Sequence, residues 1–227
     1  MKNKTKLTCI FAVLILGAVS INAADEANSF AGSAGTKYAS DYHRRGDVLS
    51  AEAIQAQVGF STQLSGVEVF GDFFTNQSTA SEGSNTDEAT LGLGTSLFGD
   101  RLSAYLGVYN TDNSAESDSS LEGFLSVSVN TLLEPTLSFY QDTDESLQTF
   151  EGQLSYDVDI DIVNLGLAGV LGSTDTMAIK NQTYTALTAT VSRDIRDDFS
   201  IYADISLSDA DNRTNETTWG LGLSMNF

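Results

Sequence analysis

Carboxylates recur along the sequence at positions that alternate with apolar residues, and they are the side chains with the widest scope for chemistry. Rings of carboxylates that face water select cations, because they attract positive ions at close range. The pattern therefore predicts an acidic, water-filled passage. The predicted lining comprises Glu68, Asp72, Arg101, Tyr105, Glu122, Glu151, Asp157 and Asp204.

Enzymatic chemistry finds little support in the sequence. His43 is the single histidine, and ester hydrolysis would need it as a base beside a serine and an orienting group. Ser40 and Ser50 are near it in sequence, but no motif links them. The cluster of His43, Arg44 and Arg45 is more typical of a strand end or loop that pairs with acids or contacts lipid phosphates. No phosphate loop or metal-ligand spacing occurs, so we expect no enzyme, cofactor or metal site.

The chain begins with a pattern typical of a secretory signal. Basic residues precede an apolar run from Leu7 to Val19, and small residues follow up to Ala23. We expect residues 1–23 to be a signal peptide that is cleaved after Ala23. Cys9 is the only cysteine and lies within that run, so we expect neither a lipoprotein anchor nor disulfides in the mature chain.

The mature chain is expected to be strongly acidic. Removing the three signal lysines leaves eight Lys and Arg against 31 Asp and Glu, a net charge near −23. Nucleic acid is therefore excluded as an expected partner, because phosphate binding needs clustered basic residues. Acidic segments between the apolar stretches leave open whether divalent cations bind there, although they lack a calcium-loop signature.

A period of two residues dominates the rest of the chain and predicts β-strands. At the end, Trp219, Leu221, Leu223, Met225 and Phe227 share one face. About twelve such stretches occur, of which the first is the least distinct. They lie at residues 37–43, 54–60, 67–73, 91–97, 102–108, 121–129, 137–139, 150–158, 163–171, 187–191, 199–207 and 219–227.

Connections between these stretches alternate in length. Short turns are expected near residues 65–66, 99–100, 133–135, 159–162 and 194–198, and longer polar connections near 44–50, 76–88, 110–119, 142–147, 173–182 and 209–216. This plan is typical of transmembrane antiparallel up-and-down β-barrels, which have short periplasmic turns and longer outer loops. We expect an all-β barrel of about twelve strands over residues 37–227, although ten or fourteen strands remain alternatives. A short periplasmic segment is expected at 24–36, and both termini are expected in the periplasm.

A soluble β-sandwich or closed barrel would also show alternation. The unbroken series of hairpins, the signal and the aromatic terminus favour the membrane barrel. Its apolar face would then meet lipid and its polar face the lumen. Phe70, Phe74, Phe124 and Val170 fall on the polar face, so we expect a partly filled lumen.

Two segments resemble known families. The stretch from Trp219 to Phe227 resembles the carboxyl-terminal targeting strand of outer-membrane barrels, and so implies recognition by the barrel-assembly machinery. Residues 38–42, with Arg45, Gly46 and Ser50, resemble the opening of the proteobacterial porins of the TorF type. These resemblances imply the bacterial outer membrane as location, and membrane lipid and lipopolysaccharide as partners.

Two functions remain open on the sequence. One is a porin, a passive channel for small hydrophilic solutes or ions with a preference for cations. The other is a non-conducting barrel that strengthens the envelope or displays loops for adhesion. Solute specificity and assembly into a homo-oligomer stay undecided.

Overall fold

The computed structural model describes residues 30–45, 47–80, 83–114, 119–143, 147–175, 182–211 and 213–227. The predicted signal peptide lies outside these residues. No helix of the described part is long and apolar enough to cross a membrane.

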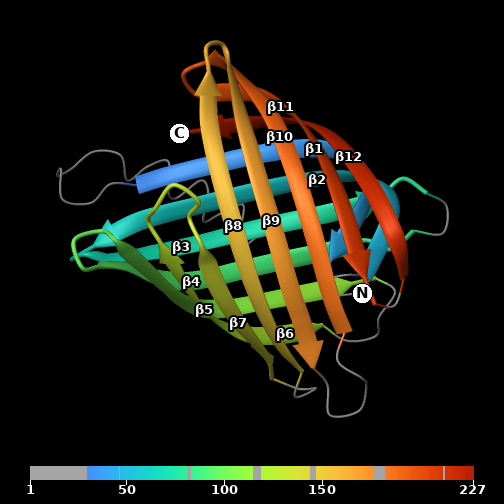
Figure 1. The fold of residues 1–227 in the computed structure, drawn as a ribbon, viewed down its shortest axis with the longest axis horizontal. Coiled ribbons are helices and arrows are strands. Elements are labelled where there is room, and N and C mark those ends of the chain that lie inside the picture. Colours follow the sequence, from blue (N-terminus) through green and yellow to red (C-terminus); the bar gives the residue numbers. More distant parts are fainter. Residues whose placement is uncertain are drawn as a thin grey trace, which may run out of the picture.

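Twelve antiparallel strands form one closed barrel, as the sequence predicts (Figure 1). Each strand pairs with its neighbours in sequence, and β12 pairs with β1, for example Met225 with Ala34. The backbone of Phe227 exchanges two hydrogen bonds with Gly32, which ties the last residue into this seam. The strands are β1 (Phe30–Arg44), β2 (Asp47–Leu64), β3 (Val67–Ser78), β4 (Thr86–Leu97), β5 (Leu102–Asn113), β6 (Ser120–Val129), β7 (Thr136–Asp142), β8 (Gln148–Ile160), β9 (Val163–Asp175), β10 (Gln182–Arg196), β11 (Phe199–Ala210) and β12 (Arg213–Asn226).

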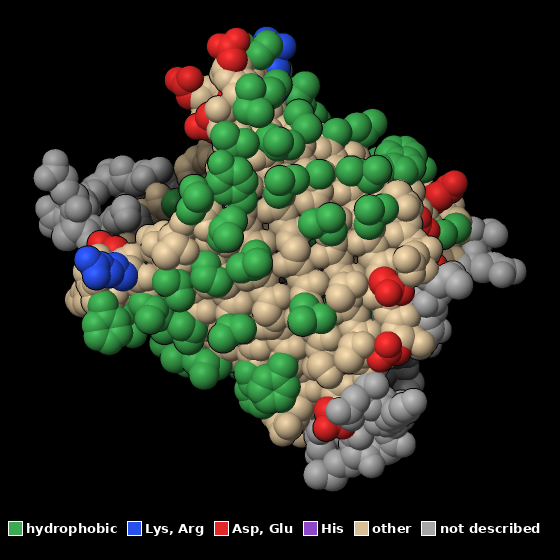
Figure 2. Space-filling view, in the orientation of Figure 1, with side chains coloured by type: hydrophobic (Ala, Val, Ile, Leu, Met, Phe, Trp, Pro, Cys, Tyr) green, Lys and Arg blue, Asp and Glu red, His purple; other side chains and the backbone are tan. Residues whose placement is uncertain are grey.

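The barrel is apolar outside and polar inside. Large hydrophobic side chains on the outer wall are highly exposed, including Leu106 at 57% and Leu171 at 61%, and Figure 2 shows such side chains spread across the wall. Many of the most buried side chains are polar, such as Asn76 and Thr86, both 0% exposed. A soluble fold would bury the apolar set in a core, whereas a membrane barrel turns it toward lipid. The arrangement is therefore that of a membrane barrel.

Tight turns close one end of the barrel. Ser65 and Gly66 both have positive φ, 54° and 83°, in the two-residue turn between β2 and β3. Turns with positive φ at both central residues match the right-handed twist of the strands they join. The other short connections, at 98–101, 130–135, 161–162 and 197–198, lie at this same end.

Several boundaries differ from the sequence prediction. β1 begins at Phe30, so residues 30–36 belong to the barrel wall and not to a separate segment. The expected long connections at 44–50 and 209–216 are mostly strand, because β1 runs to Arg44 and β2 begins at Asp47, and β11 runs to Ala210 and β12 begins at Arg213. The prediction treated polar residues as loop, but inward-facing strand residues of a barrel are also polar.

Candidate functional site: a hairpin across the lumen

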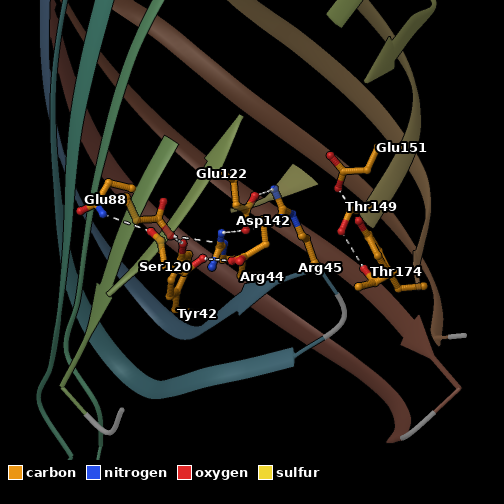
Figure 3. Close-up of polar contacts among 12 residues, drawn as sticks. Tyr42, Arg44, Arg45, Glu88, Ser120, Glu122, Asp142, Thr149, Glu151 and Thr174 are labelled. Carbon is orange, nitrogen blue, oxygen red and sulfur yellow. Dashed lines mark hydrogen bonds and ion pairs between the residues drawn. The ribbon is translucent and has the colours of Figure 1, made fainter. Parts of the chain in front are cut away.

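The tip of the β1–β2 hairpin, residues 41–51, leaves the barrel wall and enters the lumen. Pairing between the two strands skips Ser40 and Glu52, and Glu52 has a φ of +47°. A second irregularity separates Tyr42 from His43. Such interruptions bend strands. Figure 3 shows the bent hairpin running across the barrel interior.

Hydrogen bonds fix the base of this hairpin tip to the wall. Asn76 on β3 donates to Ser50 Oγ at 2.7 Å, and the side chain of Ser84 bonds to the carbonyl of Leu49. On another side of the barrel, Gln182 Nε2 at the start of β10 lies 3.4 Å from Asp47 Oδ1. Contacts with β3 and β10 place the tip across the opening at the long-loop end.

An ion cluster at the tip spans the lumen. Glu122 lies on β6, nearly opposite β1 in the strand order. Arg45 binds it with both terminal nitrogens, at 2.8 Å to Oε1 and 2.6 Å to Oε2, and Arg44 Nη2 lies 3.2 Å from Oε1 (Figure 3). Two-pronged contacts between arginine and carboxylate are among the strongest polar contacts in proteins. Glu122 is only 3% exposed, so the cluster replaces water around it.

Arg44 also connects the cluster to β4. Its Nε lies 3.8 Å from Glu88 Oε1, and Tyr42 donates a hydrogen bond to the same oxygen at 2.6 Å. Burial works against the charge of Arg45, but the hydrogen bond and charge of Glu122 outweigh it, so the pKa of Arg45 is raised. Arg45 therefore remains charged.

Aromatic rings of the barrel wall contact the two guanidinium groups. Arg44 lies 4.9 Å from the ring centroid of Tyr109, and Arg45 lies 4.2 Å from that of Tyr140. Both distances are within the range of cation–π attraction. The cluster is thus constrained by acids and by rings on separate strands.

The arginine pair lies between two cavities. One, of about 650 Å³, lies in the lumen and is lined by Arg44, Arg45, Glu68, Phe70, Tyr105 and Glu151 among others. The other, of about 520 Å³, lies at the long-loop end and also includes Arg44 and Arg45, with Glu122 and Asp142. The hairpin tip therefore lies where the two cavities meet.

The predicted lining residues occupy different places. Glu68, Tyr105 and Glu151 line the lumen cavity, and Tyr184 donates a hydrogen bond of 2.5 Å to Glu151. Glu122 is part of the ion cluster. The remaining inward acids lie along the wall: Asp72 accepts from Gln57 at 2.9 Å, Asp204 pairs with Lys37 at 3.3 Å, and Asp157 lies over Gly166.

Arg101 lies elsewhere. It belongs to the exposed turn between β4 and β5, because strand pairing ends at Leu97 and Leu102. The predicted interface residues Trp219, Leu221, Leu223, Met225 and Phe227 lie exposed on the outer wall, and Trp219 contacts Tyr38 at 5.6 Å between ring centroids.

Sequence reasoning missed the central role of Arg44 and Arg45 in the lumen. A signal existed, because they are the only two adjacent basic residues in the sequence. Glu88 and Lys37 were also missed. Neither the alternation nor the composition indicated that the hairpin would bend inward.

Inward aromatic rings lie over glycines of the neighbouring strand. A Cβ added at Gly92 would lie 2.4 Å from the Phe70 ring, and one at Gly222 would lie 2.4 Å from the Tyr202 ring. Phe70 also contacts Tyr105 and Phe124, with centroids 5.8 and 6.4 Å away. Glycines therefore make room for the rings, and the lumen is partly filled, as predicted.

Gly107 gives a test of this packing. An alanine Cβ there would lie 2.3 Å from the carbonyl oxygen of Leu91 and 2.8 Å from Gly92 Cα, contacts that no side-chain movement relieves. We expect Gly107→Ala to lower the free energy of unfolding by about 1–3 kcal/mol. Gly169→Ala is the matched control, since its Cβ would meet nothing within 4 Å. Urea unfolding in detergent measures both, and equal stability of the two variants would contradict this packing.

Comparisons with known proteins support the fold. No protein-family model matches the sequence, and no curated protein matches it. Several solved structures, however, match the fold of this chain. The KdgM porin, also solved in complex with disordered oligogalacturonate, superposes with a TM-score of 0.56 at 12% identity, covering 87% of this chain and 99% of that one. The COG4313 outer membrane channel from Pseudomonas putida F1 gives 0.55 at 11% identity, covering 90% and 97%. The NanC porin gives 0.53 at 12% identity, covering 86% and 98%. At these identities the likeness shows a common barrel fold.

Proposed function

We propose that the chain is a porin of a bacterial outer membrane, a passive channel for small hydrophilic solutes or ions. The observation that carries this proposal is a closed twelve-strand barrel with an apolar outer wall, a polar inner wall and two cavities on either side of a hairpin constriction. Barrels of this size lie between filled eight-strand barrels and wide porins. The passage is accordingly narrow.

The same proposal sets the orientation and the partners. The short-turn end and both chain termini face the periplasm, and the long-loop end faces outward. The apolar wall contacts membrane lipid, and the acidic loop end lies near lipopolysaccharide. The barrel-assembly machinery would recognise Trp219 of β12 and Phe227, which directly follows β12, and residues 1–23 remain a predicted signal peptide.

The lumen favours cations under this proposal. Basic side chains that face inward in the described part are Lys37, Arg44 and Arg45, and each has an acidic partner. Further carboxylates, among them Glu68, Asp72 and Asp157, remain in excess. Oligogalacturonate, with which the KdgM porin has been solved, is a polyanion, and this acidic lumen would disfavour such a solute.

A barrel closed by its own hairpin is the second candidate. The observation that favours it is the bidentate contact between Arg45 and Glu122 across the lumen. Such a barrel would act as a structural or loop-displaying protein, and it would not conduct.

Charge neutralisation tests the cation preference. We expect Glu68→Gln with Glu151→Gln to lower the ratio of potassium to chloride permeability by about twofold, because both carboxylates line the lumen cavity. The reversal potential of refolded protein in a KCl gradient measures this ratio. Asp161→Asn is the control, since Asp161 lies in the turn between β8 and β9. An anion preference in the unmodified protein would contradict the proposed selectivity.

A further inference from the structure

Three side chains from three strands form a chain of contacts at the long-loop end of the lumen. His43 Nδ1 lies 3.0 Å from Ser208 Oγ on β11, and His43 Nε2 lies 3.2 Å from Glu216 Oε2 on β12. Ser208 is 165 residues from His43 in sequence. The fold therefore supplies the serine and the orienting group that the sequence around His43 lacks.

The barrel wall presents the serine and the acid together. Ser208 and Glu216 are direct partners in the pairing of β11 with β12. Ser208 shares the inward face of its strand with Asp204, which pairs with Lys37 inside the barrel. The hairpin tip then brings His43 over both. Bending of that tip thus assembles the group of three.

The proposed chemistry uses the imidazole tautomer with its proton on Nε2, on the side of Glu216. Glu216 Oε2 can only accept and lies 3.2 Å from Nε2, an ion-pair distance without hydrogen-bond geometry, so its charge favours the proton on Nε2. Nδ1 then carries the lone pair that faces the hydroxyl of Ser208. A serine in hydrogen-bond contact with a base, and a carboxylate beside the other ring nitrogen of that base, form an arrangement that can activate the serine as a nucleophile.

We propose that Ser208, His43 and Glu216 form a serine esterase site that faces the lumen. Ser208 Oγ attacks the ester carbonyl carbon, and its proton passes to His43 Nδ1. The bond between the carbonyl carbon and the ester oxygen breaks, and the alcohol leaves with that proton. Water, activated by His43, then attacks the acyl-serine, which releases the carboxylic acid and restores Ser208.

The inward position of the site indicates its substrate class. Membrane lipid contacts the outer wall, whereas Ser208 and Glu216 lie on inward positions of β11 and β12. The substrate is therefore a short, water-soluble ester that enters the lumen, and not an acyl chain in the bilayer. The site does not depend on passage of solutes through the whole barrel.

Labelling with a fluorophosphonate tests the nucleophile. The probe is added to the full chain refolded in detergent, and mass spectrometry locates the modified residue. We expect modification of Ser208, loss of labelling in Ser208→Ala, and at least a tenfold slower reaction in His43→Gln and Glu216→Gln. Ser206→Ala is the matched control, because Ser206 lies on the same inward face but bonds to Thr188.

Hydrolysis separates the substrate classes. We expect the refolded protein to cleave p-nitrophenyl acetate, with Ser208→Ala reducing the rate to that of the empty detergent, and to leave micellar p-nitrophenyl palmitate intact. Absence of labelling at Ser208 in protein with the heat-modifiable migration of a folded barrel would overturn the proposal. Equal hydrolysis by Ser208→Ala would overturn it as well, and preferential cleavage of palmitate would overturn the lumenal substrate class. Conductance is measured separately, so failure of the channel proposal would be distinguishable.

Discussion

Removing the hairpin tip is expected to raise the single-channel conductance by roughly threefold or more. The variant replaces residues 42–50 by Asn-Gly, which joins Asp41 to Ala51. These two residues are direct partners in the ladder, so a two-residue turn suits the connection. The change deletes Arg44 and Arg45, and so removes the constriction between the two cavities.

The barrel should fold without this tip, because the wall pairing of β1 with β2 continues from Phe30 to Ala39. Planar-bilayer recordings measure the step size. Ser65→Asn is the control, since it introduces the same Asn-Gly turn at the opposite end of the barrel. An unchanged step size in the truncated protein would show that the hairpin does not set the width of the passage.

Neutralising Glu122 is expected to release the hairpin tip from the wall. Glu122→Gln keeps the shape of the side chain but leaves Arg44 and Arg45 without their shared carboxylate. Breaking a buried ion pair on one side costs about 3 kcal/mol, or roughly a hundredfold in the opening equilibrium. The strand ladder is continuous without this contact, so the cost falls on docking of the tip and not on the barrel.

Hydrogen exchange over residues 41–51 measures this release. Exchange should accelerate in Glu122→Gln and remain unchanged in Glu68→Gln, whose carboxylate faces the lumen cavity without contacting the arginines. The channel should also become noisier as the tip moves. Equal protection of the tip in both variants would mean that the ion cluster does not hold it.

The wall of the barrel could be predicted from sequence because its cause is local. The alternation of Leu91, Leu93 and Leu97 with small residues predicts one apolar face of the strand. Turns such as Ser65-Gly66 predict where one strand ends and the next begins. The alternation alone does not say whether the apolar face meets a soluble core or lipid. The signal and the series of hairpins favoured lipid. The count of twelve strands followed from the same periodicity.

The constriction could not be predicted in this way. Tyr42, His43, Arg44 and Arg45 carry no periodicity that would separate a surface loop from an inward hairpin. Their partners are remote: Glu122 is 77 residues from Arg45, and Ser208 is 165 residues from His43. Arg101 was assigned to the lumen by extending the alternation of β5 backwards by one residue, and the turn interrupts that alternation.

The most direct test of the central claim is single-channel recording of the unmodified mature protein, refolded in detergent, in a planar bilayer with a KCl gradient. A narrow porin with an acidic lumen predicts small, discrete conductance steps and a reversal potential displaced toward that of potassium. Silence from protein that has inserted with the heat-modifiable migration of a folded barrel would contradict the claim, and would favour a barrel closed by its own hairpin.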